Sequence, residues 1–265
     1  MSNPSPSVLY EVAKGVATLT LNRPDKLNAI NSEMARRWAD CLEQAQAEDA
    51  VRAVLITGAG RGFCSGGDVE RMGGDDAMTP LHIKERLRQG VQRVPLQLAR
   101  MDKPVIAAIN GVAVAAGLDL ALACDIRFAA ISARLGETYN RVGLVPGAGG
   151  AYFLPRIVGV AKALELLWSG ELLDAGEALD LGLVNRVFPD AELLPGARAF
   201  AERVAAAPPL SVRLIKRAVY QSLCTDLATS LDLVSSHMTL VRNSEDHAEA
   251  VAALREKRPG VFRGR

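Results

Sequence analysis

Two glycine-rich segments each follow a continuous apolar run, and their residue types suit the binding of a developing negative charge. The first spans residues 60–68 (GRGFCSGGD) and the second spans residues 110–119 (NGVAVAAGLD). Residues with almost no side chain let a ligand approach the backbone, and a following helix presents unpaired N–H groups in its first turn. Two such N–H groups from separate loops, aimed at one point, would stabilise an oxyanion. Composition leaves a second interpretation open, in which the small residues only allow tight packing of helices and strands.

Asp119 and Cys64 are the residues in these segments that suggest a chemical role. Asp119 falls one turn into the expected helix, where it suits acid/base chemistry, although the helix dipole also favours an acid there. A nucleophilic Cys64 would need a neighbouring base. The three histidines (His82, His237 and His247) share no short motif with Cys64, so we interpret Cys64 as a small buried residue. Neither segment matches the P-loop or the dinucleotide-binding pattern, which disfavours a phosphate-binding loop.

The elements around these segments alternate between apolar runs, glycine loops and helices, which predicts an α/β fold. The chain changes character after Gly150, where amphipathic helices dominate and only residues 183–188 look extended. We therefore expect an α/β core over residues 1–190 and a helical region over residues 191–265. The predicted strands span residues 8–12, 16–21, 53–57, 105–109 and 125–129, and a helix begins at Asn31 or Ser32.

Composition and charge exclude several classes of function. The chain has 265 residues, with 31 Lys and Arg against 30 Asp and Glu, and a net charge of +1 supplies no broad field for nucleic acid or an anionic membrane. No apolar run reaches the roughly 18 residues of a membrane span, and no targeting segment is evident. Four cysteines without a CxxC pair fit a reducing compartment without a structural metal. We expect a cytoplasmic protein.

Six stretches, in the family's order and spacing, resemble the crotonase superfamily, also called the enoyl-CoA hydratase/isomerase family. They are residues 21–29 (LNRPDKLNA), 62–68 (GFCSGGD), 103–111 (KPVIAAING), 115–125 (AAGLDLALACD), 143–150 (GLVPGAGG) and 178–184 (ALDLGLV). The resemblance implies a spiral of ββα units with two roughly perpendicular sheets, and C-terminal helices that assemble trimers, often paired into hexamers. It also implies an acyl-CoA thioester substrate and no cofactor beyond the coenzyme A of that substrate.

The same resemblance implies roles for four residues. The backbone N–H groups of Gly67 and Ala116 correspond to the two donors that stabilise a thioester enolate. Asp119 and Tyr139 fall where hydratases of the family carry two glutamates. Tyrosine is a poor base near neutral pH because its ordinary pKa is about 10, so Tyr139 either packs at the pocket wall or orients the substrate or Asp119. Glu137 supplies a second carboxylate if the loop is rotated.

By position, the resemblance also assigns coenzyme A contacts. Cationic residues after the second strand bind the phosphates in this family, although an exposed Arg-Pro turn would look the same. The loop after Cys64 borders the adenine and pantetheine, and a basic residue in the C-terminal segment reaches the coenzyme A of a neighbouring subunit. The residues assigned in this way are Arg23, Lys26, Ser65, Gly66, Asp68, Val69 and Phe262.

The number of carboxylates bears on the reaction. Adding water across a double bond benefits from two positioned acid/base groups, whereas moving the double bond needs one base that takes a proton and returns it elsewhere. With Asp119 as the one clear carboxylate, a 1,3-proton transfer is slightly favoured over hydration. Thioester hydrolysis, decarboxylation and C–C cleavage through the same enolate remain alternatives. An RNA-binding relative is a further alternative, which the near-zero charge and the lack of a basic stretch with interleaved aromatics disfavour.

Overall fold

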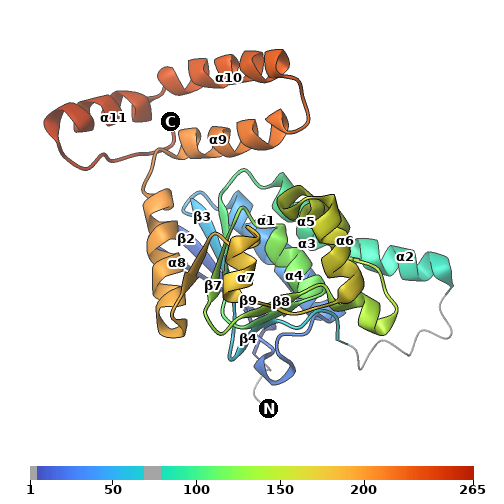
Figure 1. The fold of residues 1–265 in the computed structure, drawn as a ribbon. Helices are drawn as coiled ribbons and strands as arrows, with labels where there is room; N and C mark the ends of the chain where they lie inside the picture. Colours follow the sequence, from blue (N-terminus) through green and yellow to red (C-terminus); the bar gives the residue numbers. More distant parts are fainter. Residues whose placement is uncertain (1–4, 69–78) are drawn as a thin grey trace.

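The computed structural model describes residues 5–68 and 79–265, and Figure 1 shows an α/β body with the C-terminal helices beyond one end of it. The larger sheet has the strand order β1-β2-β3-β5-β7-β10. Its strands are β1 (Val8–Ala13), β2 (Val16–Leu21), β3 (Ala53–Gly58), β5 (Val105–Ile109), β7 (Ile126–Ala130) and β10 (Arg186–Phe188). β1 and β2 form the predicted antiparallel hairpin, and the other neighbours are parallel. Every residue of β3 and β5 is buried, as expected for parallel strands covered on both faces.

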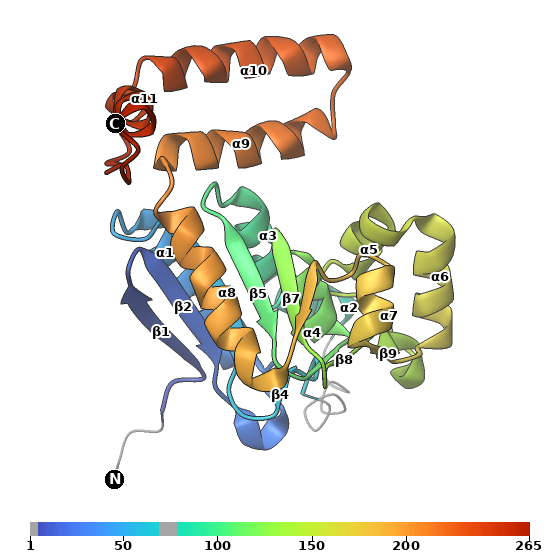
Figure 2. The same cartoon turned by 60° about the vertical axis from the view of Figure 1, so that its left-hand side comes forward.

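Helices cover both faces of the larger sheet. α1 (Ser32–Ala47), α3 (Arg93–Arg100) and α4 (Ala116–Leu122) pack their apolar side chains on one face. α8 (Asp190–Ala205) packs on the other face, and Figure 2 shows it lying along the strands. α1 begins where the sequence predicts, because the Asn31 side chain accepts a hydrogen bond from the Met34 amide at 2.8 Å.

A smaller sheet lies across one end of the larger one, as Figure 1 shows. Its strands are β4 (Gly62–Cys64), β6 (Val112–Val114), β8 (Arg134–Gly136) and β9 (Leu173–Asp174), in that order. β4, β6 and β8 are parallel and each follows a strand of the larger sheet within a few residues, so the chain repeats a strand–strand unit three times. The predicted crotonase-like fold with two sheets is confirmed.

The remaining helices connect and extend this body. They are α2 (Pro80–Gln89), α5 (Gly150–Val158), α6 (Val160–Ser169), α7 (Ala175–Asp180), α9 (Pro209–Ser222), α10 (Leu227–Arg242) and α11 (Glu245–Glu256), with short 3-10 helices η1 (Pro24–Lys26) and η3 (Thr138–Val142).

The boundary at residue 190 stays a prediction. In the structure α8 packs on the sheet, and the helices that extend beyond the body begin with α9 (Figure 2).

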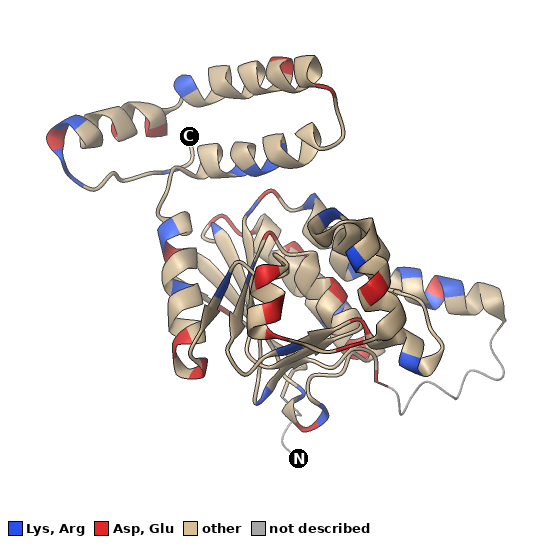
Figure 3. Ribbon diagram, in the orientation of Figure 1, with Lys and Arg blue, Asp and Glu red and all other residues tan. Residues whose placement is uncertain are grey.

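α9 is attached to the body through a polar contact. The Lys216 ammonium lies 2.8 Å from the Asp125 carboxylate, and the Tyr220 hydroxyl donates to the same carboxylate at 2.9 Å. Figure 3 shows acidic and basic residues interspersed over the body and the C-terminal helices, without one large region of a single sign. None of the described helices is long and apolar enough to cross a membrane.

Candidate active site

Three neighbouring strands of the small sheet end at the same place. Because β4, β6 and β8 are parallel, their carboxyl ends lie at one edge of the sheet. β4 leads into the loop of Gly67, β6 leads into α4 with Ala116 and Asp119, and β8 leads into η3 with Tyr139. The fold therefore brings together the four residues that the sequence predicts as catalytic.

The two glycine-rich loops are in direct contact, and glycine is required at the contact. A Cβ at Gly66, whose φ is +88°, would stand 3.1 Å from the Val114 carbonyl oxygen and 3.6 Å from the Ala116 nitrogen. A Cβ at Gly117 would overlap the Cys64 carbonyl. The close approach of the two segments thus depends on the missing side chains.

The amides of Gly67 and Ala116 are available at this contact. No described backbone carbonyl accepts a hydrogen bond from either of them. Ala116 is the first residue of α4, where an N–H group has no partner within the helix. The preceding Ala115 has φ 48° and ψ −125°, a conformation that costs a non-glycine residue about 1–3 kcal/mol. Strained backbone is characteristic of functional sites.

Asp119 is fully buried and has one oxygen occupied. Its Oδ2 accepts a hydrogen bond from the Tyr139 hydroxyl at 2.6 Å and another from the Ala148 amide at 3.0 Å. Its Oδ1 has no donor among the described residues. Burial raises the pKa of Asp119, and the Tyr139 hydroxyl and the amides of Gly150 and Ala148 oppose that rise. The arrangement fixes the carboxylate in one orientation and leaves one oxygen open.

Tyr139 acts on Asp119 as a donor. Burial, and then the negative charge of Asp119, raise the pKa of Tyr139 above its ordinary value. A phenol in this state keeps its proton and cannot serve as a base near neutral pH. Of the roles that the sequence left open for Tyr139, the structure supports the orientation of Asp119.

Glu137 lies beside Asp119 as well, without any rotation of the loop. A Cβ at Gly150 would meet Asp119 Oδ1 and would lie 3.3 Å from Glu137 Oε1. Glu137 is buried, and neither of its oxygens has a donor in the described part of the chain. Burial, and then the charge of Asp119, raise the pKa of Glu137 to about 10. The sequence predicts a role for Glu137 only if the loop is rotated. In the structure, Glu137 and Tyr139 both lie beside Asp119.

Cys64 has the structural role that the sequence predicts. It is fully buried, and burial raises the pKa of its thiol to about 12. Nucleophilic cysteines have lowered pKa values, so the burial and the raised pKa of this thiol do not support a nucleophilic role.

The predicted coenzyme A residues near η1 form a connected turn. The Arg23 guanidinium lies 2.8 Å from the Asp68 carboxylate and also donates to the Ala29 carbonyl. Ser65 donates to the Lys26 carbonyl at 3.2 Å, which holds the turn against the first glycine loop. Asp68 balances the charge of Arg23. The phosphate contact of Arg23 stays a prediction, and so do the coenzyme A contacts of Lys26, Ser65, Gly66 and Asp68. Val69 lies outside the described residues.

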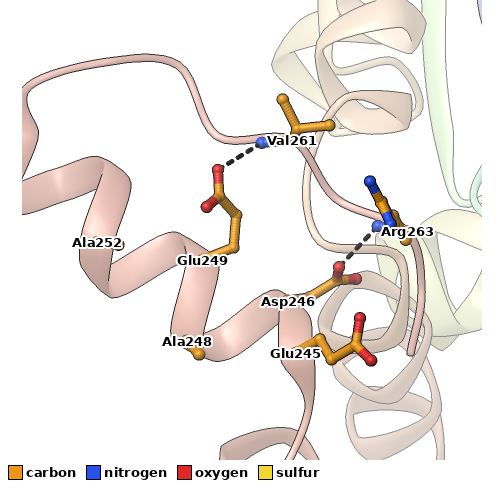
Figure 4. A pocket seen from close by; sticks show the side chains of 7 residues that line it. All are labelled: Glu245, Asp246, Ala248, Glu249, Ala252, Val261 and Arg263. Atoms are coloured by element: carbon orange, nitrogen blue, oxygen red, sulfur yellow. Dashed lines mark hydrogen bonds between the residues drawn. The ribbon is translucent and has the colours of Figure 1, made fainter.

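The C-terminal segment that carries Phe262 lies at the other end of the molecule from the glycine loops (Figures 1 and 2). The Phe262 carbonyl accepts a hydrogen bond from Arg52 at 2.7 Å. Figure 4 shows the pocket of about 680 Å³ where the C-terminal segment passes α11, with Asp246 and Glu249 holding the backbone amides of Arg263 and Val261. The structure therefore does not bring Phe262 to the site of its own chain, and only a site in another copy remains open to it.

A metal site is not evident in residues 5–68 and 79–265, where no group of three or more His, Cys, Asp or Glu side chains could hold an ion. What the described site offers is two free backbone amides, a buried carboxylate oriented by a phenol, and a second buried carboxyl.

Known proteins share both the sequence and the fold. The sequence profile described as enoyl-CoA hydratase/isomerase matches residues 11–265. The 1,2-epoxyphenylacetyl-CoA isomerase of Escherichia coli (strain K12) is 40% identical over 262 residues, covering 97% of this chain and 98% of that protein. The (E)-benzylidenesuccinyl-CoA hydratase of Thauera aromatica is 36% identical over 260 residues, covering 97% and 99%.

A solved structure agrees with these relatives. The crystal structure of enoyl-CoA hydratase from Bacillus anthracis superposes with a TM-score of 0.92 at 34% identity, covering 98% of this chain and 100% of that chain. The profile match, the full-length relatives and the superposition extend over nearly the whole chain. The chain therefore belongs to the enoyl-CoA hydratase/isomerase family, in the crotonase superfamily of acyl-CoA-processing enzymes.

Proposed function

We propose that this enzyme moves the double bond of an enoyl-CoA thioester, with Asp119 as the group that removes and returns the proton. The observation that carries the proposal is the pairing of Asp119 with Tyr139, whose hydroxyl donates to Asp119 Oδ2 at 2.6 Å. A second carboxylate base at position 139 would suit hydration, but a tyrosine that keeps its proton cannot fill that role. One base is sufficient for a 1,3-proton shift.

The chemistry follows from the free oxygen of Asp119 and the two amides. Asp119 Oδ1 takes a proton from a carbon next to the double bond, and the electron pair of that C–H bond delocalises onto the thioester oxygen as an enolate. The N–H groups of Gly67 and Ala116 would stabilise this charge, and removing one such donor typically costs about 10²–10³ in rate. The protonated Asp119 then returns the proton to the carbon at the other end of the system, so no water or cofactor is consumed.

The acyl group is best sought among aromatic substrates first. The relatives from Escherichia coli and Thauera aromatica carry names that specify a phenyl-bearing acyl-CoA, one as an isomerase and one as a hydratase. Their names therefore point to the class of acyl group without separating the two reactions. A panel of CoA thioesters with phenyl-bearing and aliphatic enoyl groups tests both.

The experiment reads each thioester by mass spectrometry and proton NMR after incubation with the wild type, Asp119→Asn and Tyr139→Phe. We expect a double-bond shift without change of mass in the wild type, and its loss in D119N. Fast addition of water to crotonyl-CoA by the wild type, lost in both variants, would instead establish hydration. Release of free CoA or of carbon dioxide, or a cleaved acyl chain, would establish hydrolysis, decarboxylation or C–C cleavage.

We also propose a homotrimer or hexamer in the cytoplasm. The helices beyond the body expose large apolar side chains that a monomer would leave in water. They include Leu223, Leu227, Leu231 and Leu254, each more than half exposed. Native mass spectrometry of the purified protein is expected to give a mass of three or six chains, and a monomer at micromolar concentration would contradict this assembly.

A further inference from the structure

We propose that Asp119 and Glu137 form a proton-sharing pair, in which Glu137 remains a carboxylic acid and positions the Asp119 carboxylate by donating to its open oxygen. The inference rests on the proposed role of Asp119 as the base. It assigns to Glu137 a positioning role in the same reaction.

The burial and the positions of the two carboxyl groups support this inference. Glu137 is 1% exposed and Asp119 is 0% exposed, so neither group reaches solvent. Asp119 Oδ1 and Glu137 Oε1 both lie within 3.3 Å of the point where a Cβ at Gly150 would stand. Asp119 Oδ1 and both Glu137 oxygens lack a donor within the described ranges. Two ionised carboxylates would therefore face each other as acceptors only.

The charges around the pair do not allow both groups to be ionised. α4 contributes Asp119 and η3 contributes Tyr139, while the backbone amides come from Ala148 before α5 and from Gly150 at its first position. No described lysine, arginine or histidine acts on either carboxyl. Two like charges without a cation in a buried site are strongly unfavourable, and such carboxyl pairs retain one proton.

A single proton on the pair removes the repulsion between two buried charges and supplies the missing hydrogen-bond donor. A protonated Glu137 removes a buried charge and becomes a donor for Asp119 Oδ1, so the pair changes from two acceptors to a donor and an acceptor. An ionised carboxylate oxygen has two lone pairs, so Asp119 Oδ1 keeps one of them for the substrate proton. Placing the proton on Glu137 agrees with the raised pKa of that residue, about 10, and leaves Asp119 ionised through its bonds from Tyr139 and Ala148. Glu137 in this state cannot act as a base, which is consistent with a reaction that needs only one.

A direct test is infrared spectroscopy of the free enzyme in the carboxylic-acid region, recorded as a function of pH. We expect a protonated-carboxyl signal in the wild type at pH 8 that disappears near pH 10. The signal should be absent from Glu137→Gln, persist in Y139F, and titrate at lower pH in D119N because the neighbouring charge is removed. A wild type without the signal at pH 8, or an E137Q variant that keeps it, would overturn the proposal.

Kinetics separate positioning from a purely structural role. The side-chain amide of the E137Q variant still offers an N–H donor to Asp119, whereas Glu137→Leu offers none. We expect E137L to lower kcat by about 10- to 100-fold, the range for losing one hydrogen bond to a charged group. The acid limb of the kcat/KM profile of E137L should move to higher pH, because the lost donor had favoured ionised Asp119. The acid limb of E137Q should remain where it is in the wild type. Equal acid limbs in the two variants would contradict the positioning role.

Different results would contradict the proposed isomerase function and the proposed Asp119–Glu137 pair. The infrared signal concerns the free enzyme and is independent of which reaction the enzyme performs. If D119N retained full isomerase activity, the proposed function would be wrong even with the signal present. If the signal were missing and D119N were inactive, the proposed function would stand and the pair would not.

Discussion

Asp119 in α4 and Asp246 in α11 are buried to the same extent, at 0% and 2% exposure, but their surroundings differ. Asp246 accepts hydrogen bonds from the amides of Arg263 and Gly264, both at 2.7 Å, and so has a donor on each oxygen. Among the described residues, Asp119 has hydrogen-bond donors on Oδ2 and none on Oδ1, and it lies beside a second carboxyl. A buried acid with complete hydrogen bonding holds the chain together. One with an open oxygen has the capacity to take up a proton, and this is the difference between the two ends of the molecule.

The strongest test of this comparison replaces each aspartate by its amide. D119N is expected to lower the turnover number by about 10²–10⁴-fold, the usual contribution of a positioned base, with little loss of thermal stability. Asp246→Asn is expected to leave turnover within a few-fold and to lower the melting temperature, because its amide cannot accept two charge-assisted bonds equally well. Turnover assays and calorimetry on both variants check this, and the reverse pattern would refute the comparison.

Removing the phenol donor should have the next largest effect on turnover. Y139F takes away the hydrogen bond to Asp119 Oδ2 and leaves Ala148 as the donor there. We expect kcat to fall by about 10-fold or more, in line with one lost bond to a charged group. The acid limb of kcat/KM should shift to higher pH, since Tyr139 favours ionised Asp119. A pH–rate profile identical to the wild type would show that Tyr139 does not act through Asp119.

E137Q tests the comparison through stability. The folded-state pKa of Glu137 is raised to about 10 from an ordinary value of 4.5, so the folded protein binds more protons than the unfolded chain between these values. This group therefore lowers stability progressively as pH rises from 4.5 to about 10. E137Q should be more stable than the wild type at pH 8, by on the order of 1 kcal/mol or more, and the difference should vanish near pH 4. Urea unfolding at the two pH values measures it, and a constant difference would count against the raised pKa.

Glu249, at the other end, should show a pH dependence of the opposite sign and the smallest effect. Its hydrogen bonds from Arg258 and from the Val261 amide lower its pKa to about 2. The stability that it contributes is present above its ordinary value of 4.5 and is lost as pH falls toward 2. Glu249→Gln should flatten the acid side of the melting-temperature profile slightly and leave turnover unchanged. An acid profile that matches the wild type would remove Glu249 from the set of acids that hold the chain.

The sequence predicts most of the elements that carry the site. The glycine loops, the helix with Asp119 and the strands were predictable because apolar runs and glycines mark where parallel strands end. The resemblance supplied the two-sheet fold, which the short strands β4, β6 and β8 of three residues each could not have revealed.

The interactions among the predicted residues were less accessible. The sequence predicts a second carboxylate from Glu137 only if the loop is rotated, whereas in the structure Tyr139 donates to Asp119 and Glu137 lies beside Asp119 at the same time. Tyr139 lies in the 3-10 helix η3 and Glu137 immediately precedes that helix, and no apolar periodicity in the sequence marks this turn. The Arg23–Asp68 ion pair and the remote position of the C-terminal segment depend on packing between distant parts of the chain, which no local pattern encodes.

The loops that follow β4, β6 and β8 contribute different kinds of groups to the candidate site. The amides near Gly67 and Ala116 belong to the backbone, so substitutions elsewhere leave their chemistry intact. The loop after β8, by contrast, contributes side chains at positions 137 and 139. Under the roles proposed above, exchanging those two residues is expected to change the reaction, while the backbone amides that would hold the thioester stay as they are.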